Sequence, residues 1–177
     1  DNWCVDAYFW NVYPFWRLLN FIKMTANNPL KRITELQALS HDHHHGLQLC
    51  WKIRTGFAKK IQPKRIKKYT DWFYENHLKP HFELEEKHIF SILEPKNELI
   101  KQALIEHKLL SHLFEKKTNP ELSLSRIEKE LQAHIRFEER ILFAEIQQIA
   151  TAEQLSKIKT SHSRETFEEN EQDLFWV

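Results

Sequence analysis

Glycine is nearly absent from this chain: only two of its 177 residues are glycine, and they have no phosphate-loop spacing. Two glycines cannot supply the turns of a β-sandwich, a β-barrel or a doubly wound sheet. The same scarcity excludes the glycine-rich loops that cradle phosphate groups. The composition therefore predicts a mostly helical protein, and the length is enough for one domain with its own hydrophobic core.

Cysteine and net charge are also low. Cys4 and Cys50 form no C-x-x-C pair, which argues against a disulfide framework or a thiolate zinc site and favours a reducing compartment. The 26 basic and 25 acidic residues leave a net charge of +1, so no strong field points to nucleic acid or to a membrane surface. We therefore expect a cytoplasmic protein without a nucleic-acid partner.

Residues 1–28 differ from the rest as an aromatic N-terminal extension. Eight aromatic side chains lie within residues 1–23, but polar residues interrupt them and no basic segment precedes them. The extension is thus predicted to be neither a signal peptide nor a membrane span. Because Met24 is the only methionine, one hypothesis is that the natural start is Met24, with the preceding residues an upstream translation or a docking segment. Residues 29–177 are expected to form the folded domain.

Proline and asparagine divide that domain into helical segments. Hydrophobic periodicity predicts long helices over about residues 36–60 (or from 40), 63–93, 97–117 and 121–150, and a shorter one over about 152–165. Pro80 should kink the second helix. Four long helices with short connections predict an all-α, up-and-down four-helix bundle with an extra short C-terminal helix. The polar tail that follows is expected to dock its apolar tip on the bundle.

Histidine, by contrast, is abundant, with 11 residues. Residues 81–90 (HFELEEKHIF) and residues 134–143 (HIRFEERILF) share one pattern at an offset of 53. In each, a histidine precedes a glutamate by four positions, so the pairs His81–Glu85 and His134–Glu138 each occupy one helix face. The second pair lies within an apolar stripe, where an unpaired carboxylate would be costly to bury. A metal ion that binds both side chains would remove that cost.

Two more histidines complete the predicted ligand set. His107 lies on the apolar face of the third helix, and the stripe of the first helix favours His43, with His44 or His41 as alternatives. Four histidines and two carboxylates without sulfur exceed what one zinc ion binds and suit two iron or manganese ions bridged by two glutamates. His77 is a candidate to support a ligand. The predicted ligands are His43, His81, Glu85, His107, His134 and Glu138.

These motifs, together with Asp42-His43-His44 and Glu106-His107, resemble the hemerythrin-like HHE cation-binding family over about residues 36–146. The resemblance implies a four-helix bundle with a non-heme di-iron centre, bridged by two carboxylates and an oxo or hydroxo group. The chain departs from the oxygen-carrying hemerythrins, since Ser111 stands where they have a second histidine on the third helix. It also has HxxxE where their fourth helix has HxxxxD.

With four histidines rather than five, both ions are expected to keep an exchangeable position. We therefore expect a di-iron protein that binds or senses dioxygen, nitric oxide or peroxide, or iron itself. The alternative is a redox enzyme with peroxidase, NO-reducing or stress-repair activity at the same centre, with Tyr69 or Tyr74 as the candidate proton donor. A metal-free structural or partner-binding bundle is the third hypothesis.

Overall fold

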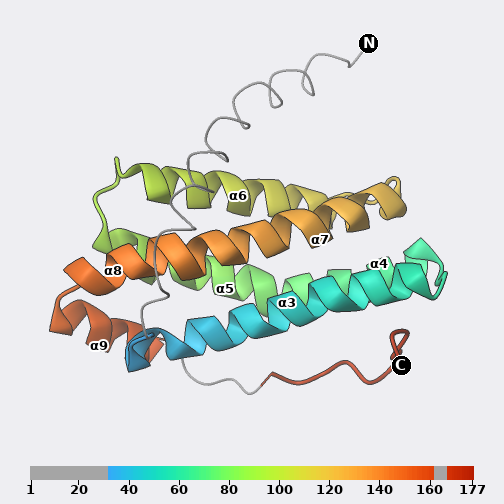
Figure 1. Ribbon diagram of the computed structural model, residues 1–177, viewed down its shortest axis with the longest axis horizontal. Coiled ribbons are helices and arrows are strands. Elements are labelled where there is room, and N and C mark those ends of the chain that lie inside the picture. The colour runs from blue at the N-terminus through green and yellow to red at the C-terminus, as the bar shows by residue number, and fades with distance from the viewer. Residues whose placement is uncertain (1–31, 162–166) are drawn as a thin grey trace, which may run out of the picture. The chain divides into compact units, whose positions relative to one another are not determined.

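The computed structural model describes residues 32–161 and 167–177. The chain divides into two units, residues 1–31 and residues 32–177, and the described residues all belong to the second. The expectations for the aromatic extension and for Met24 lie outside the described residues. Within those residues the protein is helical and contains no strand, so the all-α class is confirmed (Figure 1). None of the described helices combines the length and the hydropathy of a membrane span.

The described helices follow the predicted segments closely. The first long segment is α3 (Gln37–Ala58), which a short 3-10 turn precedes. The second consists of α4 (Pro63–Phe73), the π-helical turn η2 (Tyr74–Leu78), α5 (Lys79–Leu84), the π-helical turn η3 (Glu85–Ile89) and the 3-10 turn η4 (Phe90–Ile92). The third is α6 (Glu98–Glu115). The fourth consists of α7 (Pro120–Phe137), the π-helical turn η5 (Glu138–Leu142) and α8 (Phe143–Ile149), and α9 (Ala152–Ser161) follows.

The helices pack lengthwise as a bundle. In Figure 1, α3, α6 and α7 extend along the same direction, with α4 and α5 beside them. Helix α7 contacts α3, α4 and α6, and α9 contacts the turns at the end where α3 begins. The helix starts are fixed by local chemistry, because the side chains of Asn97 and Asn119 accept hydrogen bonds from Leu99 N and Leu122 N. These caps explain why the predicted boundaries at Asn97 and Asn119-Pro120 are confirmed.

Pro80 is accommodated by a widened turn. Because proline has no N–H, it leaves a carbonyl of the preceding turn without its α-helical partner. The π-helical turn η2 ends two residues before Pro80, and the helix continues through α5. Two further π-helical turns, η3 and η5, begin at Glu85 and Glu138, so the sequence repeat recurs in the backbone. Such turns are frequent at functional sites.

A buried polar layer divides the hydrophobic core into two clusters. On α3, Leu39 belongs to one cluster and Leu49 to the other, and buried His43 lies between them. On α6, Ala103 and Leu110 bracket His107 in the same way. The six predicted ligands therefore form one layer across the bundle.

The apolar tip of the C-terminal tail packs on the bundle, as predicted. It contacts the part of the core that lies beyond His43 on the side of Leu49. Phe175 is buried in the cluster that contains Leu49, and Asp173 accepts two-point hydrogen bonds from Arg65. A Cβ atom on Gly56 would lie 2.7 Å from Ile66 Cδ1 and 2.9 Å from Phe175 Cε2, so this glycine lets the tail and α4 approach α3 closely.

Candidate metal centre

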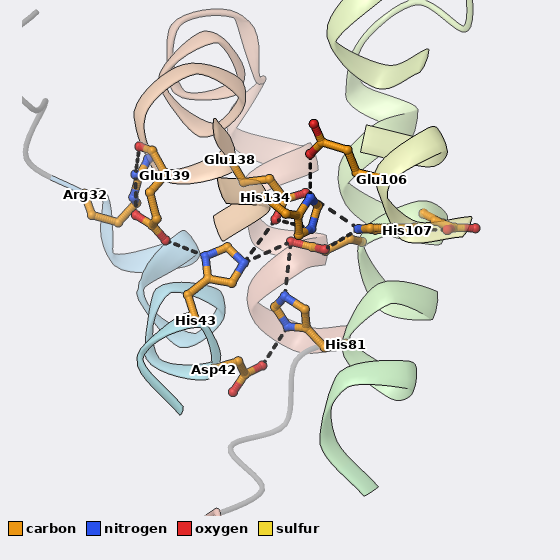
Figure 2. A network of polar contacts seen from close by, with 11 residues as sticks. Arg32, Asp42, His43, His81, Glu106, His107, His134, Glu138 and Glu139 are labelled. Atoms are coloured by element: carbon orange, nitrogen blue, oxygen red, sulfur yellow. Dashed lines mark hydrogen bonds and ion pairs between the residues drawn. The ribbon is translucent and has the colours of Figure 1, made fainter. Parts of the chain in front are cut away.

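The six predicted ligands converge in the interior of the bundle (Figure 2). Each is at most 5% exposed, and Glu85 and Glu138 are fully buried. His43 comes from α3 and His81 from α5, whereas His107 comes from α6 and His134 from α7. The two glutamates open the π-helical turns η3 and η5. Of the three candidates in the first helix, His43 is buried in this group, whereas His41 and His44 are exposed.

The ligand atoms form two groups of four that could each hold a metal ion. One group contains His43 and His81, and the other contains His107 and His134. Both groups contain Glu85 and Glu138, and within each group the ligand atoms lie within 4.8 Å of one another. Two ions placed in these groups would share both carboxylates.

Distances between neighbouring ligand atoms match those expected when two atoms bind the same metal ion. Nε2 of His43 lies 3.1 Å from Oε2 of Glu138, and Nε2 of His134 lies 3.3 Å from the same atom. Nε2 of His81 lies 3.3 Å from Oε1 of Glu85. Two atoms that each bind an ion at about 2.1 Å are about 3.0 Å apart at a right angle and about 3.4 Å apart at the tetrahedral angle. The side chains are thus spaced as ligands of a metal ion.

These ligand atoms also lack hydrogen-bond partners within the described residues. The set comprises Nε2 of all four histidines and both carboxylate oxygens of Glu85 and Glu138. Buried polar atoms are normally hydrogen-bonded, because an unsatisfied one costs free energy. A metal ion would satisfy all eight atoms, so the donor set fits a metal centre on its own chemistry.

The second nitrogen of every ligand histidine contacts a carboxylate. The Nδ1–oxygen distances are 2.7 Å for His43 with Glu139, 3.0 Å for His81 with Asp42, 2.9 Å for His107 with Glu86 and 2.9 Å for His134 with Glu106. When Nδ1–H donates to a carboxylate, Nε2 carries the lone pair that a metal ion binds. These four carboxylates therefore orient the ligands, and sequence reasoning assigned them no role. Their sequence signals are that each directly adjoins a predicted ligand and that each lies within the motifs that carry the family resemblance.

Arg32 extends this support behind His43. Its Nη2 donates to the Glu139 carboxylate at 2.7 Å and to the Glu139 carbonyl oxygen at 2.5 Å, and its Nη1 donates to Gln147 at 2.9 Å. Burial opposes the charge of Glu139, but the hydrogen bond from His43 and the charge of Arg32 lower the pKa of this carboxyl to about 2. Glu139 thus stays ionised as the partner of His43.

The negative charge of the buried carboxylates stabilises positive charge on the groups around them. Burial alone would lower the pKa of His43, but the nearby Glu138 carboxylate and the hydrogen bond with Glu139 raise it to about 9. Burial likewise opposes the charge on His81, and the charge of Glu85 with the hydrogen bond to Asp42 raises its pKa to about 10. The pKa of Glu138 lies well below its ordinary value despite burial, because the neighbouring histidines stabilise the carboxylate. Protons on the histidines and metal ions are therefore alternative sources of the same compensating charge.

The other candidate residues do not belong to the two groups of ligand atoms. His77 packs against Trp72, Phe73 and Phe167. The Tyr69 hydroxyl contacts Lys52 and Glu169, each at 2.6 Å. His112 is exposed on α6, and His162 lies outside the described residues.

Comparisons with protein families, curated proteins and solved structures find no match to this chain. The interpretation of the site therefore depends on its residues and their geometry.

Proposed function

We propose that the chain is an up-and-down, hemerythrin-like four-helix bundle with a non-heme di-iron centre that binds or senses a small ligand such as dioxygen, nitric oxide or peroxide. The observation that carries this proposal is the sharing of Glu85 and Glu138 between two buried groups of ligand atoms. One ion would take His43 and His81, and the other would take His107 and His134. Nitrogen and oxygen ligands without sulfur favour iron, with manganese as the other suitable metal.

The number of ligands supports small-molecule binding. Each ion would receive two histidine nitrogens and one oxygen from each glutamate, which makes four protein ligands. Iron commonly binds about six ligands, so each ion would keep positions for a bridging group and for an exchangeable ligand. When bound, the pair of irons would supply coordination and electron transfer to that ligand.

The surroundings of the histidines favour an uncharged diatomic ligand. Phe82 stacks on His107 with ring centroids 4.0 Å apart, and Phe143 stacks on His43 at 5.4 Å. Phe90 lies 5.4 Å from the His107 ring. Aromatic side chains of this kind exclude water and offer no charged group to a bound ligand, so the ligand would be held by the metal ions themselves.

Metal content and ligand binding test the proposal together. Protein produced with sufficient iron should contain about two irons per chain, show charge-transfer absorption, and change its spectrum when the reduced form meets dioxygen or nitric oxide. His134→Ala should lose the ion of its own group and retain about one iron, whereas the control His112→Ala removes an exposed histidine of α6 and should keep both ions. A folded, metal-free wild-type protein would overturn the proposal.

A redox enzyme is the second candidate, and one contact favours it. The Tyr74 side chain is buried, and its hydroxyl interacts with Ser111, which follows His107 by one helical turn on α6. This hydroxyl is thus a candidate proton donor, because its partner Ser111 lies one helical turn from His107. If peroxide is turned over, Tyr74→Phe should slow turnover without changing iron content, and the control Tyr69→Phe should not. Equal rates for wild type and Tyr74→Phe would remove this role.

A further inference from the structure

A second group of histidines lies on the outer side of α3. His41 and His45 are one helical turn apart, and their Nε2 atoms face each other at 3.2 Å. The two rings meet edge to face, with centroids 4.7 Å apart and an interplanar angle of 84°. We propose that His41 and His45 form a separate surface site for one divalent transition-metal ion.

The nitrogen separation has the value that a chelated ion requires. Two imidazole nitrogens bound to one ion at about 2.05 Å are about 2.9 Å apart at a right angle and about 3.3 Å apart at the tetrahedral angle. The observed 3.2 Å lies between these values. An ion could therefore bind both nitrogens without movement of the helix.

The contacts of His45 prepare its nitrogen for a metal. Oε1 of Gln48 lies 3.2 Å from Nδ1 of His45. An amide oxygen only accepts, so Nδ1 carries the proton and the lone pair on Nε2 accepts the hydrogen bond from Nε2–H of His41, whose proton a bound metal ion would replace. Phe167 stacks on the same ring at 4.0 Å with an interplanar angle of 12°. The ring is thus held in the binding orientation before an ion arrives, which reduces the entropy cost of binding.

His44 does not share this arrangement, although it is adjacent in sequence. Its Nε2 lies 3.0 Å from the side-chain nitrogen of Gln48, whose N–H donates to it. The centroids of the His44 and His41 rings are 6.5 Å apart. His44 is therefore a matched control within the same cluster of histidines.

The chemistry of the pair selects the class of ion. Two neutral imidazoles without a carboxylate suit copper, nickel or zinc rather than magnesium or calcium. His41 is exposed, so water can fill the remaining coordination positions. His43 lies between the pair in sequence but is buried in the interior group, so an ion bound by His41 and His45 is distinct from the two interior ions.

Titration of the full chain with Cu²⁺, read by equilibrium dialysis and by electron paramagnetic resonance, tests this site. Wild type should bind one Cu²⁺ through two imidazole nitrogens, and His41→Ala or His45→Ala should each weaken this ion at least about tenfold. His44→Ala should change its affinity by less than about twofold. Gln48→Ala should give an intermediate loss, because the ring of His45 loses its orienting partner.

The outcome is independent of the interior centre. The measured quantity is the difference of one Cu²⁺ between wild type and His45→Ala, while the iron content of both proteins is counted in parallel. If iron is absent from both, the proposed function fails and the Cu²⁺ difference still tests the surface site. Unchanged Cu²⁺ binding in His45→Ala, or an equal loss in His44→Ala, would overturn the proposal.

Discussion

Nδ1 of His107 lies 2.9 Å from Oε1 of Glu86, which belongs to the preceding helical segment. A carboxylate–histidine contact of the same kind joins each helical segment to the next, and the fourth segment to the first. The four contacts therefore form a closed ring of carboxylate–histidine pairs around the bundle. Asp42 of α3 contacts His81 on the second segment, Glu106 of α6 contacts His134 on the fourth, and Glu139 of the fourth contacts His43 on α3 (Figure 2). Every segment therefore orients a proposed metal ligand of the next one.

This ring couples the packing of the bundle to the geometry of the centre. Each carboxylate directly adjoins a proposed metal ligand on its own segment, as Asp42 adjoins His43 and Glu106 adjoins His107. A shift of one helix along its axis would displace both a ligand and the support of a neighbouring ligand. The centre thus favours one helix register.

Glu106→Gln tests the ring at one point. The amide keeps the size of the side chain but removes the charge that holds Nδ1–H of His134, so iron affinity should fall by about 10–100-fold. Competition with a chelator measures this change. The control Glu98→Gln alters an exposed carboxylate on the same helix, which pairs with Lys101. Equal iron affinity in wild type and Glu106→Gln would show that the carboxylate has no orienting role.

Removal of a ligand that both ions share should lower the iron content more than removal of a ligand that binds one ion. Glu138 belongs to both groups of ligand atoms, whereas His107 belongs to one. Glu138→Ala should therefore abolish binding of both irons, and His107→Ala should retain about one iron per chain. Metal analysis of the purified variants gives these counts. Identical stoichiometry in the two variants would contradict a bridging role for Glu138.

The helices and the six buried candidate ligands could be predicted from the sequence because both depend on local pattern. Asn97 and Asn119 cap helices through contacts with residues two and three positions away, so the breaks can be read directly. The pairs His81–Glu85 and His134–Glu138 are within one helical turn, and their repetition within apolar stripes identified them. The stripe of α3 likewise favoured His43.

The supporting residues could not be predicted in this way, because their partners are distant in sequence. Glu139 is 96 positions from His43, and Arg32 is 107 positions from Glu139. Only the packing of the segments brings these side chains together. The π-helical turns at Glu85 and Glu138 also escaped prediction, since helical periodicity does not distinguish them from α-helix.

Arg32→Ala should destabilise the fold more than loss of an ordinary surface ion pair. Arg32 donates to Glu139 and Gln147 in a half-buried position, so its loss should lower the free energy of unfolding by about 1–3 kcal/mol. The control Arg54→Ala removes an exposed arginine that pairs with Glu128 and should cost less than about 1 kcal/mol. Urea unfolding of both variants measures the difference, and similar losses would refute the role assigned to Arg32.

The C-terminal tail should make the stability of the fold depend on pH in acid. Glu169 accepts hydrogen bonds from Lys52 at 2.5 Å and from Tyr69 at 2.6 Å. Burial would raise the pKa of Glu169, but these two hydrogen bonds bring it below its ordinary value of 4.5. A carboxyl with a lowered folded-state pKa contributes stability above its unfolded pKa and loses that contribution as pH falls through the folded value.

Glu169→Gln should therefore be less stable than wild type above about pH 5, and the difference should shrink as the pH falls below about 4. Urea unfolding across this range measures the difference, and Glu171→Gln, at an exposed position of the same tail, is the control. Amide hydrogen exchange of residues 173–177 should become faster in the variant at neutral pH, because Lys52 no longer holds the tail by an ion pair. A stability difference that stays constant down to pH 3 would mean that ionised Glu169 does not hold the tail.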